Sequence, residues 1–168
     1  MTPPVLEAVS WAVRPLGIAD HGTVLGFFED PAFFFRTPVP DTLSQTAVLG
    51  LLTDTTRLIL ADGEPAGLLD WELMGPEHTS HHRLYLRLRH GLAPERWRQA
   101  YDEAVAALRW RTEVVTVTTL TGEYDPEGTQ VLRDHPQFRY EGCLRATHLR
   151  HGRRYGHHHF SRHWADTP

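Results

Sequence analysis

The sequence predicts an α/β protein with a mixed, mostly antiparallel sheet, and three observations lead there. Arg83–Arg89 alternates leucines with arginine and tyrosine, the period-two pattern of a strand with one buried face. Pro94–Trp110 reads as a helix that opens with proline and an acid in its first turn. Asp62-Gly63 lies between two apolar runs and marks a hairpin turn. Because no linker or repeat interrupts these pieces, we predict one domain over residues 1–168.

The remaining elements alternate in chain order, and helix caps and β-branched residues place them. The other expected strands are Trp11–Leu16, Thr56–Ala61, Pro65–Met74, Val114–Leu120, Arg139–Leu149 and Tyr155–His163. The other expected helices are Ile18–Glu29 with Asp20 as a cap, Asp41–Leu52 with Asp41 as its N-cap, and Asp125–Asp134. Pro31–Pro40 is expected to be a loop with an apolar tip.

Composition limits the classes of function. The chain has 168 residues, with 40% hydrophobic and 23% charged, as in ordinary globular domains. A net charge of −4 argues against a nucleic-acid partner. No stretch approaches the roughly 18 apolar residues of a membrane helix, and Met1–Glu7 does not resemble a signal peptide. The single cysteine, Cys143, allows no internal disulfide, so we expect a cytoplasmic location.

All 17 basic residues are arginines, and the chain contains neither lysine nor asparagine. Codon usage in a GC-rich bacterial genome explains this, and selection for forked guanidinium contacts is the alternative. Either way, a lysine Schiff base and an asparagine oxyanion donor are excluded as catalytic devices.

The segment from Asp125 to Arg145 reads DPEGTQVLRDHPQFRYEGCLR. It resembles the part of the GNAT (N-acetyltransferase) superfamily in which a capped helix runs into GF-x-x-EG-x-LR, matched here by Phe138, Glu141, Gly142, Leu144 and Arg145. Val13–Leu16 is similar to the first strand of that family. The resemblance implies the GNAT fold, with acyl-coenzyme A bound in a V-shaped gap between two central strands.

The resemblance also implies where the cofactor would bind. The family holds the pyrophosphate on backbone N–H groups at the start of the helix after the gap, in the pattern Q/R-x-x-G-x-G/A. Here that segment is Glu95–Ala100, with an acid in the first position and Arg98 at a glycine position. Arg89–Ala93 offers a shifted alternative. The cofactor would be acetyl-CoA or another acyl-CoA, no metal is expected, and the candidate contacts are Arg89, Arg96, Arg98, Gln99 and Ala100.

Acetyl transfer to an amine needs a base for the ammonium and an acid for the thiolate. Asp70 and Glu72 lie two residues apart on one strand, so they share a face that either lines the cleft or meets solvent. Tyr85 and Tyr124 are the candidate acids, and structural roles are the alternative for both.

Histidines on the last strand are a second set of candidates. His157 and His159 share one face, where they would act as an acid/base pair or be structural. Their spacing matches no established zinc motif. Phe33, Phe34 and Phe35 would shape an apolar pocket for a small-molecule substrate, pack in the core, or form an exposed homodimer patch.

The first functional hypothesis is therefore an acyl-CoA-dependent N-acyltransferase acting on a small-molecule amine. Asp70 or Glu72 would be its base, and Tyr124 or Tyr85 its acid. A second hypothesis is a GNAT-fold enzyme that no longer uses acyl-CoA and performs other acid/base chemistry, such as cyclisation or elimination, through His157 and His159. A third is a non-catalytic protein that binds a small molecule.

Overall fold

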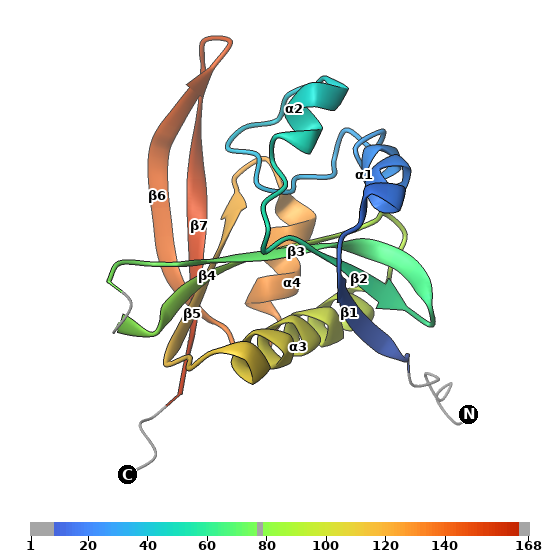
Figure 1. The fold of residues 1–168 in the computed structure, drawn as a ribbon. Helices are drawn as coiled ribbons and strands as arrows, with labels where there is room; N and C mark the ends of the chain where they lie inside the picture. The colour runs from blue at the N-terminus through green and yellow to red at the C-terminus, as the bar shows by residue number, and fades with distance from the viewer. Residues whose placement is uncertain (1–8, 77–78, 165–168) are drawn as a thin grey trace, which may run out of the picture.

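A computed structural model describes residues 9–76 and 79–164, so the expectation for Met1–Glu7 lies outside the described residues. Seven strands form one sheet in the order β1-β2-β3-β4-β5-β7-β6 (Figure 1). All neighbouring strands are antiparallel except β4 and β5, which confirms the predicted fold class. The strands are β1 Trp11–Pro15, β2 Arg57–Ala61, β3 Glu64–Leu73, β4 His81–Leu88, β5 Thr116–Gly122, β6 Arg139–Arg150 and β7 Arg153–His163.

Helices cover both faces of the sheet. The long helix α3 (Pro94–Arg111) and the short helix α4 (Pro126–Arg133) pack on one face with the alternating leucines of β4 (Figure 1). On the other face α1 (His21–Phe27), α2 (Gln45–Leu49) and the Phe33–Phe35 loop enclose a smaller core. Leu68 of β3 belongs to that smaller core and Leu69 to the larger one, as expected for a strand whose side chains alternate.

Two helix predictions are wrong in their limits. The segment Ile18–Glu29 divides into a 3-10 turn, η1 (Ile18–Asp20), and α1. The Asp20 carboxylate does not cap α1, because it accepts hydrogen bonds from the Gly17 N–H and from Arg14 instead.

The second helix begins later than predicted. Ser44, not Asp41, is the N-cap of α2, and its hydroxyl accepts a hydrogen bond from the Ala47 N–H at 3.2 Å. Asp41 pairs with Arg150 at the far end of β6, and this long-range ion pair replaces the expected local cap. By contrast, Asp125 caps α4 as expected and accepts from the Gly128 N–H at 3.0 Å.

The middle of the sheet opens where its parallel strands separate. β4 and β5 pair over three residues, His81–Arg83 with Thr116–Thr118. Beyond this point the two strands no longer pair with each other. β4 continues to Leu88 beside β3, and β5 continues to Gly122 beside β7. Their far ends enclose the V-shaped gap that the sequence resemblance implied. This gap positions the candidate site.

Close approach of β3 and β4 beside this gap requires glycine at position 67. A Cβ added there would lie 2.1 Å from the Arg87 carbonyl oxygen and 2.8 Å from the Leu88 Cα. We expect Gly67→Ala to lower the free energy of unfolding by about 1–3 kcal/mol, since the strands must move apart to admit the methyl group.

Urea denaturation measures this cost. Gly22→Ala in α1 is the control, because no atom lies within 4 Å of a Cβ added there and alanine favours the helix. If the two variants lost equal stability, steric crowding at Gly67 would be the wrong explanation.

Candidate active site

A cavity of about 210 Å³ lies at the inner end of the gap. Its walls come from the lengths of β4 and β5 that do not pair with each other, from the loop of residues 34–38, and from β6 and β7. Side chains that reach it include Phe34, Arg36, Tyr85, Tyr124, His148 and His157. The cavity therefore gathers residues from the whole length of the chain, and several of them carry chemistry.

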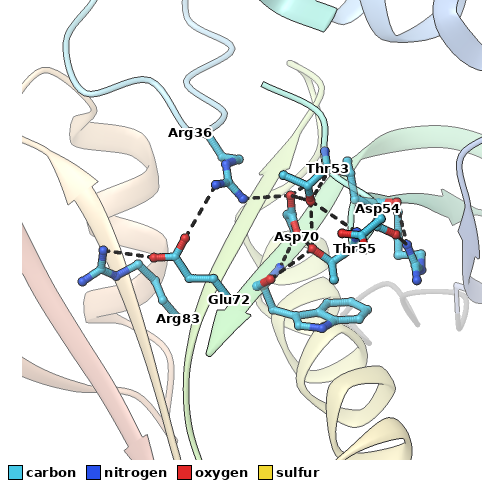
Figure 2. Close-up of polar contacts among 10 residues, drawn as sticks. Arg36, Thr53, Asp54, Thr55, Asp70, Glu72 and Arg83 are labelled. Carbon is cyan, nitrogen blue, oxygen red and sulfur yellow. Dashed lines mark hydrogen bonds and ion pairs between the residues drawn. The ribbon is translucent and has the colours of Figure 1, made fainter. Parts of the chain in front are cut away.

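The loop over this cavity is held by Arg36. Its guanidinium donates to the Asp70 carboxylate at 2.8 Å and lies 3.6 Å from Glu72 (Figure 2). It also stacks 4.5 Å from the centre of the Tyr85 ring. The backbone of Arg36 has a φ of 55°, a left-handed conformation that an arginine adopts at a cost. The ion pair with Asp70 offsets this cost and fixes the loop on the sheet.

Asp70 does not act as a catalytic base, contrary to one prediction. Its side chain is fully buried. Its carboxylate accepts hydrogen bonds from Arg36, from the Trp71 N–H, and from the hydroxyls of Thr53, Thr55 and Thr56 at 2.6 to 2.9 Å (Figure 2). Because both carboxylate oxygens already accept hydrogen bonds from these donors, neither is directed at the cavity. Asp70 is a structural anchor.

Glu72 shares the face of Asp70, as predicted, and lies between two guanidinium groups. It is 3.6 Å from Arg36 and 3.5 Å from Arg83 (Figure 2). Both guanidinium groups therefore compete with any bound molecule for the Glu72 carboxylate. Glu72 is not among the residues that line the cavity.

The two candidate tyrosines differ in what their hydroxyl groups can do. Tyr124 donates to the Thr37 carbonyl at 2.6 Å, and burial raises the pKa of its hydroxyl to about 12. Its ring lies so close over Gly122 that a Cβ there would meet it at 2.3 Å, so Tyr124 ties the loop to β5. Tyr85 lines the cavity, and burial raises the pKa of its hydroxyl, so this group keeps its proton at neutral pH and can donate a hydrogen bond.

His157 is the histidine that reaches the cavity from β7. Its ring packs edge-on against His148 with centroids 4.6 Å apart, and its Nδ1 lies 3.3 Å from the Thr147 hydroxyl. Burial, and then the neighbouring His148, lower the pKa of His157, so its imidazole is neutral at pH 7. A neutral, oriented imidazole in a cavity can accept a proton from a bound molecule.

His159 shares the strand face of His157, as predicted, but does not line the cavity. Burial lowers its pKa, and so does the positive charge of Arg83. The alternation predicted for this strand places His158 on the opposite face, where its Nδ1 lies 3.1 Å from the Tyr140 hydroxyl. His157 and His159 therefore do not both face a molecule bound in the cavity.

The phenylalanine cluster divides between two of its predicted roles. Phe33 and Phe35 are buried in the smaller core, with 3% and 1% exposure, so they cannot form an exposed dimer patch. Phe34 lines the cavity and meets the Tyr124 ring edge-on at 4.8 Å. Phe35 also lines the cavity, so two of the three phenylalanines reach it, and their role in binding an acceptor stays a prediction.

The outer part of the gap, where the fold family implies an acyl-CoA molecule, is closed by side chains. Arg87 of β4 donates to Asp125, the N-cap of α4, at 2.7 Å, and both side chains are more than nine-tenths buried. The Arg87 guanidinium lies 4.7 Å from the Trp97 ring and 5.4 Å from the Phe34 ring. This arrangement, the Arg87–Asp125 bridge, joins the end of β4 to the N-cap of α4 across the space in which a pantetheine chain would lie.

The predicted phosphate contacts at the start of α3 stay predictions. Arg98 pairs with Glu95 at 3.3 Å, and the Ala100 side chain is fully buried in the core. Arg89 and Gln99 are exposed and Arg96 is half-buried. None of these three residues lines the cavity. The Glu95 carboxylate in the first turn disfavours an anion at that helix end.

Sequence reasoning missed Arg36, Arg87 and Trp97. Arg87 belongs to the alternating polar face of its strand, a pattern that indicates solvent exposure. One signal was present, because Arg87 lies near the end of β4, where a GNAT sheet opens. That position could have indicated a side chain that faces the gap. Arg36 and Trp97 gave no such signal.

Within residues 9–76 and 79–164, no group of three or more histidine, cysteine, aspartate or glutamate side chains is placed to hold a metal ion. In the same part of the chain, no helix is long and apolar enough to cross a membrane.

Comparison with known proteins identifies the fold. No protein-family model and no curated protein sequence matches the chain. Among solved structures, the acetyltransferase that modifies the N-terminal serine of ribosomal protein L7/L12 from Salmonella typhimurium superposes with a TM-score of 0.74 at 15% identity, covering 94% of this chain and 97% of that one.

Two further structures agree. The ribosomal L7/L12 α-N-protein acetyltransferase in complex with coenzyme A gives a TM-score of 0.73 at 13% identity, covering 93% of this chain and 95% of its own. A GNAT-family acetyltransferase from Bacillus anthracis gives 0.68 at 8% identity, covering 93% and 96%. The chain therefore has the GNAT fold, as the sequence resemblance implied.

Removing the charge of Asp70 tests the anchor under the loop. We expect Asp70→Asn to lower the free energy of unfolding by about 3 kcal/mol or more, because the Arg36 guanidinium loses its buried partner and an amide N–H₂ faces threonine hydroxyls. Chemical denaturation measures the change. Asp54→Asn, on the exposed neighbouring turn, is the control and should change stability little. Equal effects would contradict the anchoring role.

The buried histidines predict that the protein loses stability in mild acid. Burial lowers the pKa of six of them, His81, His82, His135, His157, His158 and His159. The unfolded chain then binds more protons than the folded one near pH 6, so stability falls as the pH drops below about 6.5. Denaturation at pH 7.5 and 5.5 measures this. A stability that is constant or higher at pH 5.5 would contradict it.

Proposed function

We propose that this chain is a GNAT-fold enzyme that moves a proton on a small molecule held in the central cavity, with His157 as the base and without acyl-CoA. One observation carries the proposal. A histidine whose pKa is lowered by burial lines the cavity, while the Arg87–Asp125 bridge crosses the route by which a pantetheine chain would arrive. This corresponds to the second of the three functions that the sequence suggested.

Two groups on different strands supply the acid/base chemistry. His157 on β7 is neutral and accepts a proton, while the Thr147 hydroxyl beside its Nδ1 orients the ring. Tyr85 on β4 keeps its proton and can donate it, or a hydrogen bond, to an oxygen of the bound molecule. A base and a donor on two walls of one cavity suit proton abstraction next to a carbonyl group, and the cyclisation or elimination that follows from it.

The charges around the cavity indicate which small molecules it accepts. Among its described lining residues the one carboxylate is Asp125, which is already paired with Arg87. A cationic amine would therefore find no free counter-charge. Phe34 and Tyr85 offer aromatic surfaces, and the Arg36 guanidinium stacks on the Tyr85 ring. Neutral or anionic molecules with a flat ring suit these walls better than polyamines.

A second candidate is an acyl-CoA-dependent N-acyltransferase acting on a small-molecule amine, and the fold favours it. One solved structure with this fold is a complex with coenzyme A. Another neighbour modifies the N-terminal serine of a ribosomal protein, which is a protein acceptor. The small-molecule amine is therefore our proposal for this chain and does not come from that neighbour. In this function His157 would take the proton from the amine. Micromolar binding of acetyl-CoA to the unchanged protein, measured by calorimetry, would select this candidate over the first.

Deuterium exchange into a bound ligand tests His157. Small aromatic ketones and keto acids are screened by NMR for compounds that shift cavity resonances, and exchange of the hydrogen next to the carbonyl is then followed in D₂O. We expect the unchanged protein to accelerate this exchange, and His157→Gln to reduce the acceleration at least tenfold, since the amide is not a base.

The control variant is His151→Gln, at the exposed tip of the β6–β7 hairpin, which should exchange at the unchanged rate. The rate should also fall as the pH drops and the His157 imidazole becomes protonated. Equal exchange rates for His157→Gln and the unchanged protein would remove His157 from the role of base.

A further inference from the structure

We propose that the Arg87–Asp125 bridge is the specific barrier that excludes pantetheine from the β4–β5 gap, and that replacing these two side chains opens a pantetheine-binding channel. The inference rests on the proposed function and deepens it, because it assigns the loss of the cofactor to two named residues rather than to divergence of the whole chain.

The position of the guanidinium within the sheet is the first argument. Phe34 belongs to the loop on the α1–α2 face, whereas Trp97 belongs to α3 and packs in the core of the opposite face. Arg87 stacks within 5.4 Å of both rings. A group that touches residues from both faces must lie in the plane of the sheet, in the space where β4 and β5 have separated.

The partner of Arg87 closes the other side of that space. Asp125 follows β5 and caps α4, so its ion pair with Arg87 joins the end of β4 to the end of β5. The contact is 2.7 Å long, and Glu127 adds a weaker one at 3.9 Å. A chain of atoms passing from the start of α3 to the cavity would have to cross this bridge.

One buried donor beside the bridge stays available to a polar chain after Arg87 is replaced. Trp97 Nε1 is among the described buried side-chain atoms that have no hydrogen-bond partner. Unpaired buried donors are uncommon in folded proteins. Pantetheine carries two amide carbonyls, which are acceptors of the kind that this N–H group lacks.

The substitution must avoid leaving a buried charge. Removing Arg87 alone would strand the Asp125 carboxylate, so the variant used is Arg87→Ser combined with Asp125→Asn. Asparagine remains a good N-cap for α4, which protects the helix. Arg89→Ser is the matched control, because Arg89 is an exposed arginine two residues along the same strand end.

Calorimetry with pantetheine and with coenzyme A compares the three proteins, after circular dichroism has shown that each is folded. Pantetheine lacks the phosphates, so it tests the passage separately from the start of α3. We expect no saturable binding to the unchanged protein or to Arg89→Ser at millimolar ligand, and at least tenfold tighter pantetheine binding to the double variant. If the double variant does not fold, Arg87→Gln combined with Asp125→Asn replaces it, because two amides can hydrogen-bond to each other without leaving a buried charge, and a smaller gain is expected.

The outcomes separate this inference from the function on which it rests. If neither the unchanged protein nor the double variant binds pantetheine, the bridge is not the barrier, and catalysis without acyl-CoA still stands. If the unchanged protein binds coenzyme A at micromolar concentration, both the barrier and the cofactor-free function are wrong. Binding by the double variant alone supports the inference.

Discussion

The buried carboxylate of Asp70 is the constraint on which the site depends. A fully desolvated charge must be surrounded by donors, and this one draws them from three parts of the chain. Its own strand supplies the Trp71 N–H, the turn before β2 supplies threonine hydroxyls, and the loop over the cavity supplies Arg36. Satisfying one charge therefore sets the position of the loop, and the loop in turn forms one wall of the cavity.

A second buried ion pair has the opposite geometric effect. The Asp70 network holds a loop against the sheet, whereas the Arg87–Asp125 pair spans an opening in the sheet. Both pairs use arginine, the single basic residue type in this chain. The forked guanidinium can bond to a carboxylate through its edge while aromatic rings stack on its faces, which the ammonium of lysine cannot do. The arginine-only composition is thus used structurally at both places, whatever its origin.

The sequence predicted the order of elements well because the relevant signals are local. Alternation in β4, the Asp62-Gly63 turn and the Asp125 cap depend on residues a few positions apart. The limits of α2 were missed because Asp41 is taken by Arg150, more than a hundred positions away. The roles of Asp70 and Arg87 were missed for the same reason, since donors for Asp70 come from up to 34 positions away. Alternation correctly put Asp70 and Glu72 on one face, but it could not predict that one would be desolvated. The cytoplasmic location stays a prediction.

The short pairing of β4 with β5 divides the sheet into two parts. Strands β1 to β4 form one part and β5, β7 and β6 the other, and three residue pairs join them. Within each part the strands pair over five or more residues. This junction has the fewest residue pairs between strands, so it is the weakest strand-to-strand connection in the sheet. The Arg87–Asp125 pair joins the two parts across the opening, so widening the cavity at this line would require that buried ion pair to break.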